Sequence, residues 1–111
     1  METKHTTGPW VIDWNVSRLD IFGSDETTLV ASLRRSTLSP AIDEAARSNA
    51  RLIAAAPELY DALRELLTDM VIAQGNMRKA AKRDPAWEGC AEIIQPRVDA
   101  ARAAIAKAEG K

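Results

Sequence analysis

The chain has 111 residues, the size of one ordinary domain, so we expect a single domain over residues 1–111. Hydrophobic residues make up 46% and charged residues 28%, which excludes a disordered or fibrous protein. A net charge of −1 lacks the basic excess typical of nucleic-acid-binding proteins. The charge is nevertheless uneven: residues 41–70 are mainly acidic and residues 71–111 mainly basic, which favours self-association or a charged partner.

The cysteine content and the apolar runs bear on localisation. The single cysteine, Cys90, cannot form an internal disulfide, and the N-terminal residues lack the features of a secretory signal. No apolar run approaches the roughly 20 residues of a membrane-spanning helix. We therefore expect a cytoplasmic protein without a membrane partner.

Residues 1–38 are expected to form a β-meander. Apolar residues alternate from Trp10 to Trp14, a period of two that predicts a strand with both tryptophans on one face. Further strands are predicted at Arg18–Phe22 and Thr27–Leu33, with turn-forming residues between them. A sheet this small needs a cover, so we expect the following helices to pack over the tryptophans. The third strand should present three apolar residues on the covered face: Leu29, Ala31 and Leu33.

Residues 39–111 are expected to be helical. Ser39 suits an N-cap and Pro40 a first helical position, so the first helix should begin there and end near Ala55. Its apolar positions recur at spacings of three and four: Ile42, Ala45, Ala46, Asn49, Leu52, Ile53 and Ala56. Asn49 is the only polar member, and a buried amide needs a partner. We expect it to bond the sheet or the corner at Pro57; the alternative is a recognition pocket that Asn49 shares with Arg51.

Two further helices should form an antiparallel hairpin. Pro57 ends the first helix and suits the start of the second, which should end near Lys82. The third should begin at Pro85, with Pro96 kinking or splitting it. The second helix presents Leu59, Leu63, Leu66, Met70, Ala73 and Met77, and the third presents Trp87, Cys90, Ile94, Val98, Ala101, Ile105 and Ala108. We therefore predict an α+β fold: a three-stranded antiparallel sheet followed by three helices.

Two segments carry a resemblance to known proteins. "HTTGPW", His5 to Trp10, together with "SNARLIAAAPELYDALREL", Ser48 to Leu66, is similar to a group of small phage and prophage accessory proteins. Those proteins typically open with H-T-P-G-P-W and later contain N-A-R-L-I-A-A-A-P-E-L-L. The chain departs from the pattern at Thr7, where proline is usual, and at Tyr60, where leucine is common. The resemblance implies a phage protein working in the host bacterial cytoplasm, and it transfers no catalytic or ligand-binding residue.

The sequence contains no recognisable catalytic machinery. His5, the only histidine, lies far from Cys90, so we expect no metal site and assign His5 a hydrogen bond to the local backbone. Cys90 falls in the predicted helical seam beside Trp87, where a small hydrophobe fits. Acidic pairs sit on first turns or charged helix faces, and no glycine-rich phosphate loop occurs. We expect a protein that is not an enzyme and uses no cofactor.

Basic residues supply the candidate binding surfaces. A cluster at the end of the second helix could meet phosphates or an acidic protein surface: Arg78, Lys79, Lys82 and Arg83. Arg34 and Arg35 make a smaller pair. A solvated charged face is the ordinary interpretation of both. We assign structural roles to Trp10, Trp14, Asn49, Pro57 and Trp87.

These observations favour a phage-encoded binding protein that covers a functional surface of a host protein or defence complex, with anti-CRISPR-like inhibition as the most concrete version. We expect a homodimer or higher homo-oligomer, because the apolar seam of the hairpin exceeds what one subunit covers. A rival hypothesis is sequestration of a nucleotide immune signal, which needs Trp10 or Trp14 to converge with Arg34 or Arg35 at a subunit junction. The sequence is also compatible with nucleic-acid binding through the basic cluster and with a structural or replication role in the phage.

Overall fold

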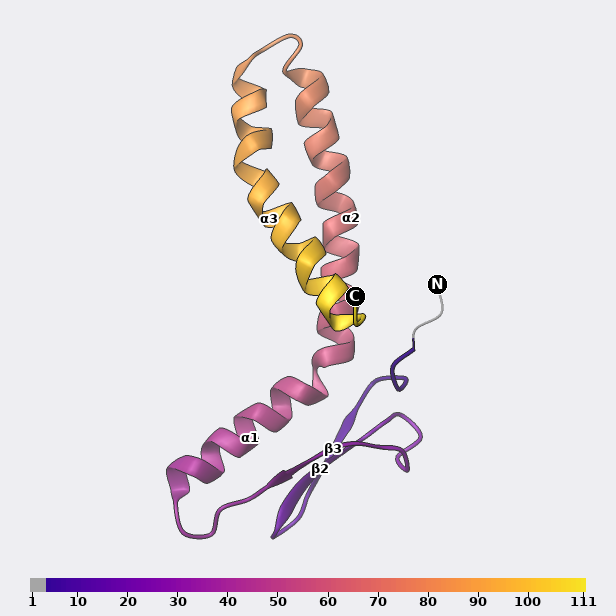
Figure 1. Cartoon of the computed structure of the whole chain (residues 1–111), viewed down its shortest axis with the longest axis vertical. Coiled ribbons are helices and arrows are strands. Elements are labelled where there is room, and N and C mark those ends of the chain that lie inside the picture. The colour runs from indigo at the N-terminus through magenta and orange to yellow at the C-terminus, as the bar shows by residue number, and fades with distance from the viewer. Residues whose placement is uncertain (1–3) are drawn as a thin grey trace. The chain divides into compact units, whose positions relative to one another are not determined.

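The computed structural model describes residues 4–111, and the chain packs into two compact units (Figure 1). Unit 1 is Met1–Leu59 and contains the sheet and the first helix; unit 2 is Tyr60–Lys111 and contains a helical hairpin. Three strands precede three helices, so the predicted α+β class is confirmed.

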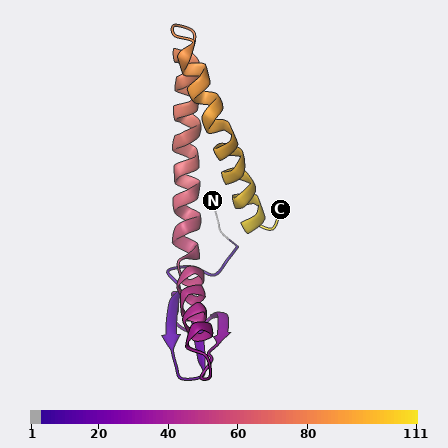
Figure 2. The same cartoon turned by 90° about the vertical axis from the view of Figure 1, so that its left-hand side faces the viewer.

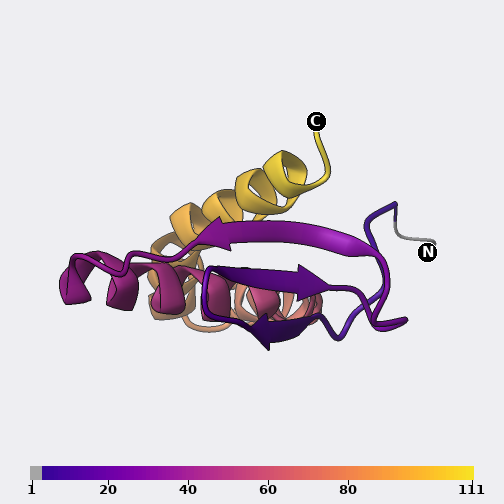
Figure 3. The same cartoon turned by 90° about the horizontal axis from the view of Figure 1, so that it is seen from below.

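The sheet of unit 1 is an antiparallel meander of β1 (Val11–Trp14), β2 (Arg18–Phe22) and β3 (Leu29–Arg34), with β2 in the centre (Figure 3). Side chains hold both turns, as their polar composition predicts. Asn15 Oδ1 accepts the amide of Arg18 at 2.7 Å, and Asp25 Oδ1 accepts the amide of Thr28 at 2.9 Å. The predicted three-stranded meander is therefore confirmed.

One face of the sheet builds the core of unit 1. The register places Ile12 opposite Ile21 and Trp14 opposite Leu19, so these four side chains share a face. Helix α1 (Pro40–Ala54) covers that face, as Figure 2 shows. Leu19, Ile21 and Ala50 are fully buried at the centre, and Trp10 packs against them. The expected helical cover is therefore provided by α1 and includes Trp10, but Trp14 is 47% exposed.

A β-bulge corrects the prediction for the third strand. Ala31 pairs with Ile21, but Leu29 pairs with Phe22, so Val30 is an extra residue without a partner in the ladder. The extra residue shifts the alternation by one position. Val30 packs against the core, whereas Leu29 is 56% exposed, so its predicted place on the covered face is wrong.

Helix α1 begins as predicted but is rotated relative to the predicted stripe. Ser39 Oγ accepts the amide of Ile42 at 3.3 Å, which confirms the N-cap. The side facing the sheet carries five residues: Asp43, Ala46, Ala50, Ile53 and Ala54. Asn49 is exposed and makes no hydrogen bond to residues 4–111, so the predicted bond to the sheet or to the Pro57 corner is wrong. Small alanines let the helix lie close to the sheet, and this selects the alanine face instead.

The break between α1 and α2 (Ala56–Ala80) occurs where the sequence predicts it. Ala55 caps α1, and Pro57 is the second residue of α2, one position later than predicted. Pro57 is buried, and Gly8 lies against its ring. The corner is therefore packed by the N-terminal segment of the same unit.

In unit 2, α2 and α3 (Ala86–Ala108) form the predicted antiparallel hairpin (Figure 1). Gln74 on α2 and Ala91 and Val98 on α3 are its buried residues. Cys90 is exposed and Trp87 is 44% exposed, so their predicted places in the seam are wrong. The seam turns toward Ala91 because the neighbouring Gln74 side chain bonds its carbonyl.

A polar network fixes the register of the hairpin. Gln74 Nε2 donates to the Ala91 carbonyl at 3.0 Å and to Gln95 Oε1 at 2.8 Å. At the other end, the Tyr60 hydroxyl donates to Glu109 Oε2 at 2.5 Å. Both groups of bonds join residues that face each other only in one alignment of the two helices.

Pro96 does not split α3, which continues from Ala86 to Ala108 around it. The proline removes the hydrogen bond that would reach the Glu92 carbonyl. Both residues are exposed, so water can satisfy that carbonyl. Of the two predicted outcomes, a kink or a split, the split does not occur.

Candidate functional site

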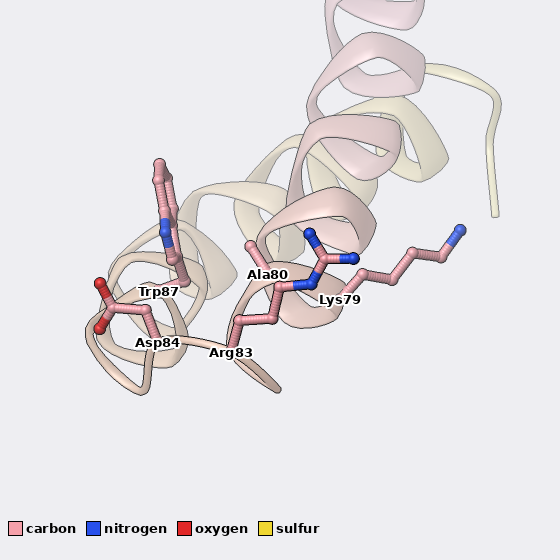
Figure 4. Close-up of a pocket in the computed structure, with 5 residues that line it drawn as sticks. All are labelled: Lys79, Ala80, Arg83, Asp84 and Trp87. Atoms are coloured by element: carbon pink, nitrogen blue, oxygen red, sulfur yellow. The ribbon is translucent and has the colours of Figure 1, made fainter.

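The tip of the hairpin forms an open hollow of about 470 Å³, lined by Lys79, Ala80, Arg83, Asp84 and Trp87. Figure 4 shows the Trp87 indole and the Asp84 carboxylate on one side, with the Arg83 guanidinium and the Lys79 side chain on the other. Cationic and aromatic groups therefore border the same hollow.

Local bonding explains why the chain turns here. The amides of Arg83 and Asp84 donate to the Ala80 carbonyl at 2.9 and 3.0 Å, which closes the last turn of α2. Asp84 Oδ1 accepts the amide of Ala86, the first residue of α3, at 3.1 Å, so this carboxylate holds the turn that leads into the helix. Asp84 is thus committed to the fold, and the groups available to a partner are the cations and the indole.

The four predicted cations divide into two kinds. Arg78 Nη2 donates to Gln95 Oε1 at 3.1 Å and thereby joins the hairpin network. Lys79 lies in the last turn of α2, where the helix dipole favours a cation. Lys82 and Arg83 lie beyond that helix. Lys79, Lys82 and Arg83 are exposed and form no ion pair with residues 4–111, so they can bind carboxylates or phosphates.

The second predicted basic pair does not form a binding surface. Arg35 Nε and Nη2 donate to the two oxygens of Asp43 at 3.0 and 2.9 Å, and its Nη1 donates to the Asn15 carbonyl at 3.0 Å. These bonds from Arg35 hold the pKa of Asp43 at about 2. Arg35 therefore clamps α1 to the sheet, and its guanidinium is engaged within the chain, whereas Arg34 is exposed.

Within one chain, Trp14 and Arg34, two of the residues named for nucleotide binding, lie on opposite faces of the sheet. Trp14 shares the α1 face of the sheet with Leu19, whereas Arg34 is paired with Arg18 on the other face. Arg51 instead lies over the Trp14 ring, 5.4 Å from its centroid, a contact the sequence does not predict. Trp10 donates its indole N–H to the Thr6 carbonyl at 3.0 Å. Trp10 packs against the core of unit 1, whereas Trp14 is 47% exposed.

His5 lies where the sequence predicts it, bonded to the local backbone. Its Nδ1 is 2.9 Å from the Thr6 carbonyl oxygen, and its ring meets Trp10 edge-on. Within residues 4–111, no group of three or more His, Cys, Asp or Glu side chains could hold a metal ion. None of the helices in this described part combines the length and apolar character required to cross a bilayer.

Comparison with known proteins identifies the family. A protein-family model described as Salmonella phage P22 protein Y8K6 matches residues 1–111. No curated protein matches the chain, and no solved structure matches it. The match covers both units, including the residues beyond Leu66 that neither of the two phage-like motifs reaches. The chain therefore belongs to the Salmonella phage P22 protein Y8K6 family.

Proposed function

We propose that this phage protein is a non-enzymatic binding protein that covers a functional surface of a host protein in the bacterial cytoplasm. Its most concrete form is a counter-defence inhibitor, similar in action to an anti-CRISPR protein. Membership of a phage family supports the phage setting, and the hairpin tip supports binding.

The observation that carries this proposal is the pairing of an exposed indole with unpaired cations at the tip. Trp87 is 44% exposed beside Lys79 and Arg83. Tryptophan and arginine are the residues most enriched where interfaces gain their energy. A complementary host surface would be acidic, with an apolar recess for the indole.

Capture from infected bacteria tests the proposal. A tagged wild-type chain should recover one host protein, and Trp87→Ala or Arg83→Glu should weaken its binding at least about ten-fold. The matched control is Arg97→Glu, which changes an exposed cation on α3 that does not line the hollow. Capture that is unaffected by both tip variants would count against the tip as the binding surface. Failure of the captured defence protein to lose activity would count against inhibition.

Nucleic-acid binding is the second candidate, because bases stack on exposed indoles while cations contact phosphates. Trp87 with Lys79 and Arg83 has this composition. Titration of single- and double-stranded oligonucleotides, followed by indole fluorescence, should then give affinities that fall steeply with salt. A signal that stays flat at low salt removes this candidate.

A further inference from the structure

A second apolar row runs along α1 on a side that does not face the sheet. Its members are Ile42, Ala45, Asn49 and Leu52, and the row continues across the corner to Ala56 and Leu59. Ile42, Leu52 and Leu59 are 62%, 64% and 53% exposed. We call these six residues the outward row.

The spacing of the outward row is that of a helix-pairing surface. Its positions alternate steps of three and four residues, the a and d positions of a heptad repeat. The residues that hold α1 to the sheet, such as Ala50 and Ile53, belong to a different stripe. The outward row is therefore not needed to fold unit 1.

We infer that α1 pairs with α1 of a second copy of this chain in antiparallel orientation. The charges beside the outward row support this partner. Glu44 and Arg51 are both exposed and lie seven residues apart along one side of α1, the acid toward its N-terminal end and the base toward its C-terminal end. An antiparallel pair brings Glu44 of each copy toward Arg51 of the other, whereas a parallel pair would align like charges.

The antiparallel orientation also brings the apolar residues of the two outward rows together. A register that brings Glu44 toward Arg51 of the second copy also places Ile42 beside Leu52 of that copy. It places Asn49 beside Ala45 of that copy. In this orientation the positive end of each helix dipole lies beside the negative end of the other, which favours the pair. Within one chain, the Glu44 carboxylate lies 3.9 Å from the Arg51 guanidinium and 4.0 Å from that of Arg47. Both ion pairs are exposed, so replacing them with a pair between two copies costs little.

The expected pairing is reversible. One helical face is small against the roughly 800 Å² per partner of a standard interface, so we expect a dissociation constant in the micromolar range. The pairing is independent of the binding function proposed above. A dimer carries two hairpin tips, so it would raise the avidity for a partner that offers two sites.

Sedimentation velocity on the full chain, from about 1 to about 300 μM, tests the inference. We expect a monomer–dimer equilibrium that Leu52→Glu shifts fully to monomer while circular dichroism and the melting temperature stay close to wild type. Ile93→Glu, at a 67% exposed position on α3, is the matched control and should leave the dimer intact. The inference is overturned if the wild-type chain is a monomer at every concentration. It is also overturned if Ile93→Glu abolishes the dimer while Leu52→Glu retains it.

Two charge variants, alone and mixed, test the pairing. Glu44→Arg and Arg51→Glu should each weaken self-association, because each places like charges together across the pair. In a parallel pair each single variant would only exchange one set of like charges for another, so a loss of self-association in both single variants indicates the antiparallel orientation. An equimolar mixture should recover the dimer, since both cross-pair contacts then join opposite charges. Contacts within one chain cannot produce this recovery, because each chain keeps its own defect. A mixture that associates no better than either variant alone overturns the antiparallel pair.

Discussion

Gly8 lies against Pro57 so closely that a Cβ atom at position 8 would come within 2.7 Å of the Pro57 Cβ. The same N-terminal segment passes the β2–β3 turn, where the amide of Ser24 donates to the Thr7 carbonyl at 3.1 Å. The two sequence segments that carry the phage resemblance therefore meet in unit 1. Packing at the helix corner explains two residues of these segments, Gly8 and Pro57.

Gly8→Ala should destabilise unit 1. Real Cβ contacts are almost never as short as 2.7 Å, and Pro57 is a rigid, buried ring that cannot swing aside. Overpacking of this kind costs about 1–3 kcal/mol of unfolding free energy. Urea unfolding, followed by tryptophan fluorescence, measures the change.

Gly89→Ala is the matched control for Gly8→Ala. Gly89 lies in α3, and a Cβ atom there would meet nothing within 4 Å. Alanine in an exposed helical position is favoured over glycine by about 1 kcal/mol. The control should therefore be neutral or stabilising. Equal losses in both variants would show that the contact with Pro57 is not the cause.

Acid should weaken unit 1 through Asp43. Bonds from Arg35 lower the pKa of Asp43 from its ordinary 3.8 to about 2 in the folded state. Between these two pKa values the unfolded state binds more protons than the folded state. The stability that the Arg35–Asp43 pair contributes is therefore fully present above about pH 4 and is lost as the pH falls toward 2. Urea unfolding across this pH range measures the slope.

Asp43→Asn should reduce the slope without abolishing it. Asp25 also has a pKa lowered to about 2, chiefly by the Thr28 hydroxyl and then by backbone amides, and it contributes in the same pH window. The double variant with Asp25→Asn should be flatter than either single variant. An acid slope in Asp43→Asn equal to that of the wild type would contradict the role of the Arg35–Asp43 pair.

Local signals in the sequence predict the chain order of elements well. The Ser39 cap, the break before Pro57 and the strand at Arg18–Phe22 follow from short-range chemistry and appear in the structure. Short-range chemistry does not predict which side of α1 faces the sheet, because the helix has two apolar rows and either could pack there. Close packing of Ala50 and the clamp from Arg35 to Asp43 decide it, and both depend on tertiary contacts.

The candidate site is predictable only in part. The basic cluster is visible in the sequence, but periodicity places Trp87 in the seam, and the structure leaves it exposed beside Lys79 and Arg83. The rotation of α3 causes this difference. Gln74, a polar residue in an apolar seam, sets that rotation by bonding across the hairpin, and hydrophobic periodicity carries no signal for it.

Gln74→Ala should destabilise the hairpin by about 1–3 kcal/mol, since it removes two hydrogen bonds and leaves a void. Gln74 is only 4% exposed and links α2 to both Ala91 and Gln95. Gln95→Ala should cost less, because it leaves the buried bond from Gln74 to the Ala91 carbonyl, and the bonds of Gln95 to Arg78 and Asp99 are exposed. Helix unfolding, followed by circular dichroism in urea, compares the two. A larger loss in Gln95→Ala would contradict the central place of Gln74.

Tyr60→Phe should loosen the C-terminal turn of α3. The Tyr60 hydroxyl donates to Glu109, and this bond lowers the pKa of Glu109 and raises that of Tyr60. Phenylalanine keeps the ring, so packing near the Arg64 guanidinium, 5.5 Å from the Tyr60 centroid, is retained. Hydrogen exchange should therefore become faster at Ile105–Glu109 and remain unchanged near Gln74, because the network there is intact. Faster exchange along the whole of α3 would instead mean that this single bond supports the hairpin globally.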